Sequence, residues 1–184
     1  MWKGFCRLLL KWMGWKSINN LMPHKKAIII GVPHTSNLDF IISYLHYTSL
    51  GGVASVVVKK ELFFCPLGFI LRKMGGIPID RSRGSRVVKL IIDEFEKRDT
   101  LHLAITPEGT RKFNKRWKAG FHTIAKATGA VVYLGFFDFG RKEIGWRDTF
   151  ELTDDAQADI KRMKAYYKEK GVVGKFSGLY TYDD

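Results

Sequence analysis

Cysteine is scarce in this chain of 184 residues, and long apolar runs are missing. Cys6 and Cys65 have neither the spacing of metal ligands nor the number needed for a disulfide framework, which favours a reducing compartment. No stretch approaches about 18 consecutive apolar residues, so we expect no membrane-spanning helix. The N-terminus also lacks the apolar core of a signal peptide, and the mature chain is expected to begin at Met1. We find no repeat or low-complexity tract, and the length suits one domain over residues 1–184.

Acidic residues are few beside the basic ones. The chain carries 31 Lys and Arg against 18 Asp and Glu, a net charge of +13. Such a surface attracts phosphates, whether they belong to nucleic acid, an anionic lipid or a phosphorylated substrate. Hydrophobic residues make up 46% of the chain, which excludes a disordered protein. Charge alone does not choose among the three kinds of partner.

The N-terminal segment, residues 1–16, contains no acid and combines three Trp with four cations. Indole rings beside basic side chains are typical of a segment at a bilayer surface, where the cations meet anionic headgroups. We therefore expect an amphipathic helix over 1–16. It either lies on an anionic membrane surface or packs on the domain, and both can hold.

Segments with the length and composition of buried strands alternate with segments of helical periodicity. This order predicts an α/β fold, a single-domain sandwich of helices around a largely parallel sheet with an N-terminal amphipathic helix. The predicted strands cover 27–32, 53–58, 75–81, 101–105 and 131–137, with antiparallel strands near 143–152, and the predicted helices cover 37–50, 87–95, 119–128 and 154–170. The apolar segment 62–71 is interpreted as a buried helix pair, with an acyl-chain channel or a membrane contact as alternatives. Residues 171–184 show no clear pattern.

The predicted strand 27–32 ends at Pro33 and leads to His34 and Asp39, five residues apart, at the start of a predicted helix. Ligands bind at the carboxyl ends of strands in such folds. A histidine, with an unperturbed pKa of about 6.5, can accept a proton there, and a carboxylate within reach would fix its tautomer. However, composition alone predicts about 0.3 such pairs per chain. Ser36 and Asp39 also match a helix-capping pattern, in which Asp39 would only cap the helix.

A second polar cluster, Glu108-Gly109-Thr110-Arg111, follows the predicted strand at 101–105. Composition predicts this tetrapeptide only about 0.002 times in the chain, so it is far more specific than the His–Asp spacing. Arg111 can hold a phosphate with two parallel charge-assisted hydrogen bonds. The alternative is a plain tight turn carrying a solvated charge, and Gly109 supports a turn in either case.

The two motifs, in this order and 74 residues apart, resemble those of the glycerolipid acyltransferase family, which includes 1-acylglycerol-3-phosphate acyltransferase. Between them, residues 75–81 are similar to the family's third block, a Gly followed six residues later by Arg. The resemblance covers residues 27–140. The chain departs from the family pattern at residues 130–135, which lack the prolines of the last block, and at Pro78, a position more often aromatic or aliphatic.

The resemblance implies transfer of a fatty acyl group from an acyl thioester, acyl-CoA or acyl carrier protein, to the hydroxyl of lysophosphatidic acid, giving phosphatidic acid. His34 would be the general base and Asp39 its orienting partner. The site that binds the acceptor would comprise Arg81, Glu108, Gly109, Thr110 and Arg111. Because a carboxylate repels a phosphate, Glu108 is expected to organise the arginine or the turn. The resemblance implies no cofactor, and nothing in the sequence suggests a metal.

Two alternatives stand beside this hypothesis. The same chemistry could act on another lysolipid acceptor, or the chain could be a non-catalytic binder of anionic membrane or nucleic acid. We find no recognisable nucleic-acid module in the sequence. The expected partners are therefore a lysophospholipid, an acyl thioester and an anionic membrane surface, but not nucleic acid. The expected location is peripheral, on the cytoplasmic face of a membrane, and the oligomeric state stays open.

Overall fold

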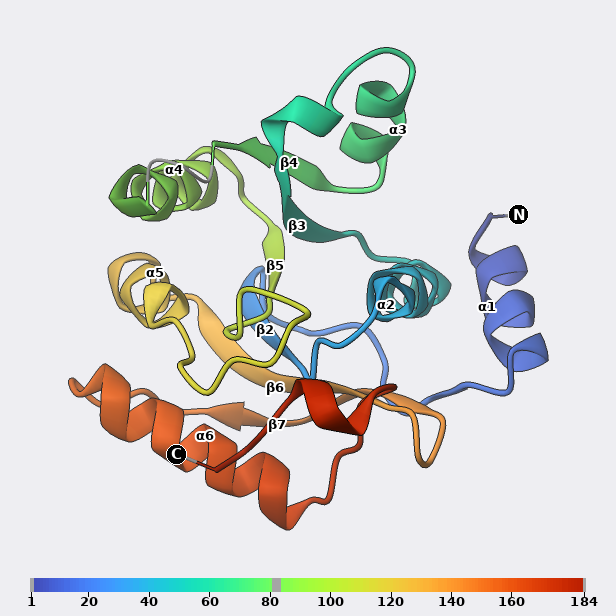
Figure 1. Ribbon diagram of the computed structural model, residues 1–184. Helices are drawn as coiled ribbons and strands as arrows, with labels where there is room; N and C mark the ends of the chain where they lie inside the picture. The colour runs from blue at the N-terminus through green and yellow to red at the C-terminus, as the bar shows by residue number, and fades with distance from the viewer. Residues whose placement is uncertain (1, 81–83, 184) are drawn as a thin grey trace.

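Seven strands form one sheet in the computed structural model, which describes residues 2–80 and 84–183. Their order across the sheet is β1-β7-β6-β2-β5-β3-β4. Neighbouring strands from β6 to β4 are parallel, whereas β7 pairs antiparallel with β6 (Figure 1). The strands are β1 (Lys16–Ser17), β2 (Lys26–Val32), β3 (Ala54–Lys59), β4 (Gly76–Ile79), β5 (Leu101–Ile105), β6 (Val131–Asp138) and β7 (Glu143–Phe150).

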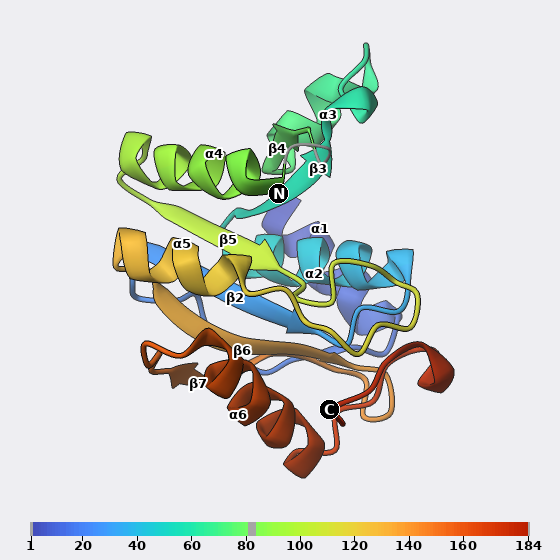
Figure 2. The ribbon, with the colours of Figure 1, turned by 60° about the vertical axis from the view of Figure 1, so that its left-hand side comes forward.

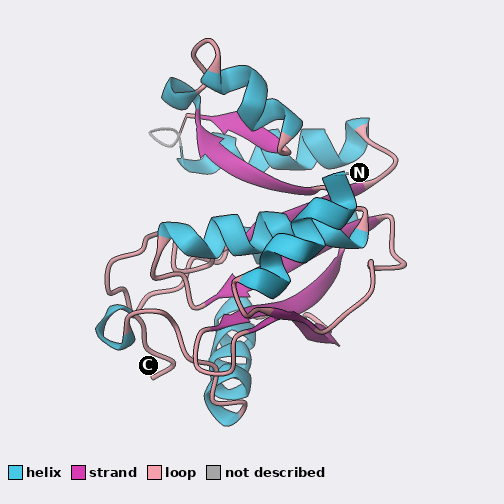
Figure 3. Cartoon of the chain, turned by 90° about the vertical axis from the view of Figure 1, so that its right-hand side faces the viewer, coloured by secondary structure: helices cyan, strands magenta, loops and turns pink. Residues whose placement is uncertain are grey.

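Helices cover both faces of this sheet. One face carries α4, α5 and α6, and the other carries α2, with α1 outside it (Figures 1 and 3). The helices described are α1 (Trp2–Trp12), α2 (Asn37–Leu50), α3 (Leu67–Lys73), α4 (Gly84–Lys97), α5 (Gly120–Thr128) and α6 (Ala156–Glu169), with short 3-10 helices η1 (Lys60–Leu62) and η3 (Ser177–Leu179). The predicted α/β sandwich around a largely parallel sheet is confirmed.

The central strand β2 explains why the site lies where it does. It is bonded to β5 on one edge and to β6 on the other, and its side chains are buried on both faces. Ile28 and Ile30 pack in the larger core under α4, α5 and α6, while Ala27 and Ile29 pack on the α2 side. Burying an isoleucine side chain stabilises a fold by about 1.5–3 kcal/mol. The end of β2 is therefore held firmly on all sides.

Two apolar segments differ from the prediction. The segment 62–71 is not a buried helix pair, because it forms the end of η1, a turn and most of α3 beyond the edge strand β4 (Figure 2). The Phe69 side chain in this segment is 65% exposed, so no other element among the described residues covers it. The N-terminal helix ends at Trp12 rather than residue 16, and the chain turns at Gly14 so that Trp15 is buried.

The remaining predicted elements agree with the structure within a few residues, and residue 81 of the predicted strand 75–81 lies outside the described residues. The antiparallel strands expected near 143–152 are the single strand β7, and β1, η1 and η3 were not predicted. No helix within the described ranges 2–80 and 84–183 has both the length and the apolar character needed to cross a bilayer.

Candidate active site

His34 lies in the loop between β2 and α2, at the carboxyl ends of the parallel strands. Figure 2 shows the arrowheads of β2 and β5 pointing to the same edge of the sheet, where the loops that follow them meet. The His34 side chain keeps 20% of its surface exposed, whereas Asp39 on the first turn of α2 is only 1% exposed. His34 Nδ1 lies 3.1 Å from Asp39 Oδ2. The sequence-based expectation that these two side chains meet at a strand end is confirmed.

A single oxygen of Asp39 serves both functions considered for this residue. Oδ2 accepts the backbone N–H of Thr35 at 2.8 Å and that of Ser36 at 2.7 Å, in addition to facing the imidazole. The bond from the Ser36 N–H is one half of a capping box, whose other half joins the Ser36 side chain to the backbone of Asp39; the Ser36 hydroxyl also accepts the N–H of Leu38. Capping the helix and orienting the histidine are therefore not alternatives here.

The tautomer of His34 follows from this contact. An ionised carboxylate only accepts hydrogen bonds, so the proton belongs on Nδ1 and the lone pair on Nε2. Nε2 has no hydrogen-bond partner within the part of the chain that the structure describes. Asp39 Oδ1 is buried and likewise has no partner among the described residues. The geometry leaves one basic nitrogen available to an incoming group.

Glu108 reaches the same loop from the end of β5. Its Oε2 accepts the backbone N–H of His34 at 2.8 Å, across 74 residues of sequence. We expected this carboxylate to organise Arg111 or its own turn; instead it holds the backbone of the histidine. Burial raises the pKa of Glu108 from its ordinary 4.5 to about 7, the His34 N–H opposes this rise, and the negative charge of Asp39 adds to it.

The rest of the second motif forms a tight turn. Gly109 has φ of +67°, a conformation that side chains disfavour, and its N–H donates to the Thr106 carbonyl at 3.0 Å. The Thr110 hydroxyl accepts the N–H of Lys112 at 3.1 Å, so this residue stabilises the turn. The exposed Arg111 side chain donates to the Asn37 side-chain oxygen at the start of α2. Two hydrogen bonds thus join the turn to the segment that begins at His34: a buried one from the His34 N–H to Glu108, and an exposed one from Arg111 to Asn37.

Comparisons with known proteins identify the family of the chain and a structure of similar fold. The family model described as Acyltransferase matches residues 16–133, well over half of the chain. The chain belongs to the acyltransferase family. The fold also resembles the crystal structure of the 1-acyl-sn-glycerophosphate acyltransferase PlsC of Thermotoga maritima, with a TM-score of 0.61 and 16% identity over 95% of this chain and 80% of that one. No curated protein matches the sequence.

Membership in this family confirms the resemblance that the motifs carry and makes the chain an enzyme, an acyltransferase. The hypothesis of a non-catalytic binder is therefore set aside. Arg81, the remaining predicted site residue, lies outside the described residues. No group of three or more His, Cys, Asp and Glu in the described part of the acyltransferase is arranged to hold a metal ion.

Sequence reasoning missed three parts of the site. The first is Thr35, a buried residue whose N–H binds Asp39 and whose hydroxyl accepts the N–H of Phe176 at 3.4 Å. The second is Asn37, the partner of Arg111, and the third is the C-terminal segment of this acyltransferase that brings Phe176 there. The Thr35–Asp39 contact is local but uses a backbone N–H, which any residue type supplies, and the Phe176 and Arg111 contacts join distant segments.

Proposed function

We propose that this acyltransferase moves a fatty acyl group from a thioester of coenzyme A or acyl carrier protein to the hydroxyl of lysophosphatidic acid, giving phosphatidic acid. The observation that carries the proposal is the imidazole of His34, with Nδ1 on Asp39 and Nε2 free among the described residues. A protein of known structure with a similar fold, described as a 1-acyl-sn-glycerophosphate (LPA) acyltransferase, supports the choice of acceptor.

The reaction begins with His34 as general base. An alcohol is a poor nucleophile until its proton leaves during attack. The acceptor oxygen bonds to the thioester carbonyl carbon while its proton passes to Nε2, and the ionised Asp39 stabilises the imidazolium through Nδ1–H. The tetrahedral oxyanion then collapses, the C–S bond breaks, and the proton on Nε2 passes to the departing sulfur. The products are an ester and a thiol, with no acyl-enzyme.

The start of α2 offers a donor for the oxyanion. The N–H groups of Thr35 and Ser36 bind Asp39, and that of Leu38 binds the Ser36 hydroxyl. The N–H of Asn37 has no such partner in the described part of the chain. A backbone N–H at a helix start stabilises negative charge, because it is unpaired and lies at the positive end of the helix dipole. We assign the Asn37 N–H this role.

Arg111 is the described cation that we assign to the acceptor's phosphate. It is exposed and its hydrogen bond goes to a neutral amide, so its charge is not neutralised by that partner. Glu108, the acid of the same motif, turns its carboxylate inward to the His34 backbone and is buried. The tight turn at Gly109 thus separates an inward acid from an outward cation, which removes the repulsion expected between a carboxylate and a phosphate.

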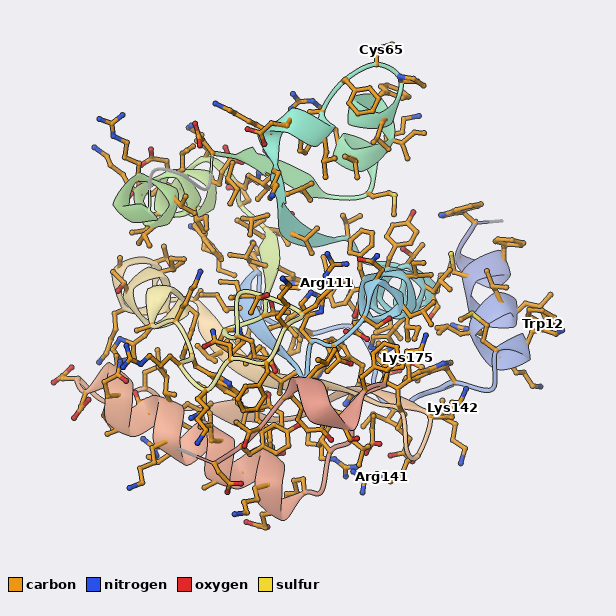
Figure 4. The ribbon with its side chains drawn as sticks, in the orientation of Figure 1. Trp12, Cys65, Arg111, Arg141, Lys142 and Lys175 are labelled. Atoms are coloured by element: carbon orange, nitrogen blue, oxygen red, sulfur yellow. The ribbon has the colours of Figure 1, made fainter. Side chains whose placement is uncertain are left out.

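Helix α1 supports a position at a membrane surface. Cys6 and Leu10 pack against α2, and Lys3 and Arg7 donate to the Leu50 and Ser49 carbonyls in its last turn. The opposite side of the helix is apolar and exposed, with Trp12 83% exposed (Figure 4). The apolar residues that share this exposed side are Phe5, Leu8 and Trp12, and Trp2 lies at its border, exposed but with its indole N–H donating to the Tyr44 hydroxyl of α2. The helix therefore packs on the protein with one face and presents a second apolar face outward.

We propose that this outward face, together with the exposed α3 segment, rests in the headgroup region of an anionic bilayer on the cytoplasmic side. Phe64 and Phe69 near α3 are exposed, and Lys73 stacks its ammonium 4.5 Å from the Phe69 ring centre. Aromatic side chains beside cations suit the boundary between acyl chains and anionic headgroups. A lipid acceptor would then reach the site without leaving the membrane surface.

The enzymatic proposal is tested by thiol release from a long-chain acyl thioester by the purified protein in detergent. We expect release that depends on lysophosphatidic acid and yields phosphatidic acid. Parallel reactions with other lysolipids test the alternative acceptor, since the same base serves any hydroxyl. The proposed acceptor would be rejected if a phosphate-free lysolipid were acylated at least as fast. Absence of release with both donor types and all acceptors would contradict the whole scheme.

The membrane proposal is tested by co-sedimentation with vesicles containing anionic phospholipid. We expect the double variant Leu8→Ser/Trp12→Ser to lose most of its binding. Leu90→Ser is the matched control, because Leu90 is also an exposed apolar residue but lies on α4, on the other face of the sheet. Equal binding by both variants, or binding to neutral vesicles only, would contradict the proposed orientation.

A further inference from the structure

The C-terminal segment, residues 171–183, returns from α6 to the carboxyl ends of the strands (Figures 1 and 2). It lies beyond the residues that the family model covers. Its far end is anchored on the core, where Tyr182 stacks on the buried Tyr167 with ring centres 5.9 Å apart and donates to the Val172 carbonyl at 3.1 Å. Asp183 adds an ion pair with Lys168 at 2.6 Å. The bond between Tyr182 and Val172 joins the two ends of the segment, and the Tyr167 and Lys168 contacts fix its far end to α6.

Its middle part packs directly on the His34 loop. The Val173 carbonyl accepts the N–H of Phe139, and three residues later the Phe176 N–H donates to the Thr35 hydroxyl. Gly174 between them is buried, and a Cβ there would lie 2.9 Å from the Pro33 side chain and 3.0 Å from that of Thr35. Only a residue without a side chain allows the backbone to come this close. The close approach places residue 175 at the edge of the candidate active site.

Lys175 is exposed at this position. Its ammonium lies 5.2 Å from the centre of the Phe176 ring, and no acid pairs with it in the described part of the chain. The segment approaches the loop at Thr35, while Arg111 approaches it at Asn37, two residues further on. Figure 4 labels Arg111 and Lys175 on the face that carries the strand ends. Arg111 and the segment that carries Lys175 thus approach the same short loop from parts of the chain that are far apart in the sequence.

We propose that the C-terminal segment forms one wall of the active site and that Lys175 binds a phosphate group of a substrate. A flexible ammonium with no competing acid is suited to a phosphate, and the stacked Phe176 ring limits where it points. The phosphate belongs either to the lysophospholipid acceptor or to the coenzyme A part of the donor. This inference rests on the proposed acyl transfer, and it adds a binding residue outside the recognised motifs.

The experiment compares wild type, Lys175→Ala, Lys175→Arg and Lys97→Ala in the thiol-release assay. Lys97 is an exposed lysine on the last turn of α4, which makes it the matched control. We expect Lys175→Ala to raise one substrate's KM about 3- to 10-fold with little change in kcat, as fits one partly exposed charge–phosphate contact. Lys175→Arg should restore the KM, and Lys97→Ala should leave it unchanged.

Two further reactions identify the source of the phosphate. With monoacylglycerol as acceptor, the effect of Lys175→Ala disappears if the acceptor carries the phosphate. With an acyl-pantetheine donor, which has no phosphate, the effect disappears if the donor carries it. The inference would be overturned if Lys175→Ala had the KM of wild type, or if its KM rose equally in both phosphate-free reactions. Wild type without any acyl transfer would instead refute the proposed function, so the two failures are distinguishable.

Discussion

The inner and outer parts of the candidate site are built differently. The inner part consists of His34, Asp39 and Glu108, and its two carboxylates are buried and bound to backbone N–H groups. The outer part consists of Arg111 and Lys175, both exposed on long side chains. Proton transfer requires a base fixed to within a fraction of an ångström, whereas a phosphate on a lipid can be met by a cation that adjusts. Substitutions should therefore affect kcat in the inner part and KM in the outer part.

The largest expected effect is that of His34→Ala. Loss of the proposed base should lower kcat by about 10²- to 10⁴-fold, the range for general base catalysis. The fold should persist, because the side chain is partly exposed and its backbone N–H still binds Glu108. Thiol release and thermal unfolding measured on the same preparation check both points. Turnover equal to that of wild type would exclude His34 as the base.

Two substitutions of Asp39 should separate its proposed role in catalysis from its role in capping α2. Asp39→Asn keeps an oxygen that accepts the Thr35 and Ser36 N–H groups, but it cannot stabilise an imidazolium, so kcat should fall about 10²-fold or more with modest destabilisation. Asp39→Ala should also lose the cap, which costs about 0.5–2 kcal/mol of unfolding free energy. Kinetics and chemical denaturation of both variants test this. If Asn were fully active, Asp39 would only be a cap.

Glu108 should act through the position of His34. Glu108→Gln keeps an acceptor for the His34 N–H and should stay within about threefold of the wild-type kcat, whereas Glu108→Ala should lose about tenfold because a buried donor loses its partner. If Glu108 had only a structural role, Glu108→Ala would lower the stability, but Glu108→Ala and Glu108→Gln would have the same kcat. The pair of kcat values, measured at saturating substrate, decides between the two.

Arg111 marks the boundary between the two parts. Arg111→Ala should raise the KM for lysophosphatidic acid about 3- to 10-fold and leave kcat nearly unchanged, since its proposed contact is with the phosphate and not with the reacting atoms. Arg111→Lys should recover part of the loss. A fall in kcat at constant KM would place Arg111 with the inner residues and contradict the division into an inner part that affects kcat and an outer part that affects KM.

The last prediction concerns the pH dependence of stability rather than the kinetics. The folded state raises the pKa of Glu108 from 4.5 to about 7, so between these values the folded chain holds more of this proton than the unfolded chain. The contribution of Glu108 to the unfolding free energy therefore falls as pH rises from 4.5 to 7, by about 2–3 kcal/mol in all. Glu108→Gln should remove this fall. Denaturation of both proteins at pH 5 and pH 8 tests the difference; equal pH dependence would contradict it.

Much of the fold was predictable from local pattern. The apolar run of β2, the Ser36-Asn37 start and the Gly51-Gly52 end of α2 each mark an element boundary through side-chain chemistry close by in the sequence. The prediction of a buried helix pair for residues 62–71 was wrong because it rested on local composition alone. These residues are as apolar as a core helix, and only the position of β4 at the sheet edge leaves them uncovered.

The candidate site divides in the same way. The sequence by itself determined the two motifs, their order, and the family, because the spacing of His34 and Asp39 and the rare Glu108–Arg111 tetrapeptide are properties of the chain. The roles of these residues stay predictions. Only the tertiary structure decided that Glu108 holds the backbone of His34, that Arg111 meets Asn37, and that the C-terminal segment covers Thr35. Each of these contacts joins segments 74 residues or more apart, which come together because the parallel strands end at one edge and α6 leads the chain back to it.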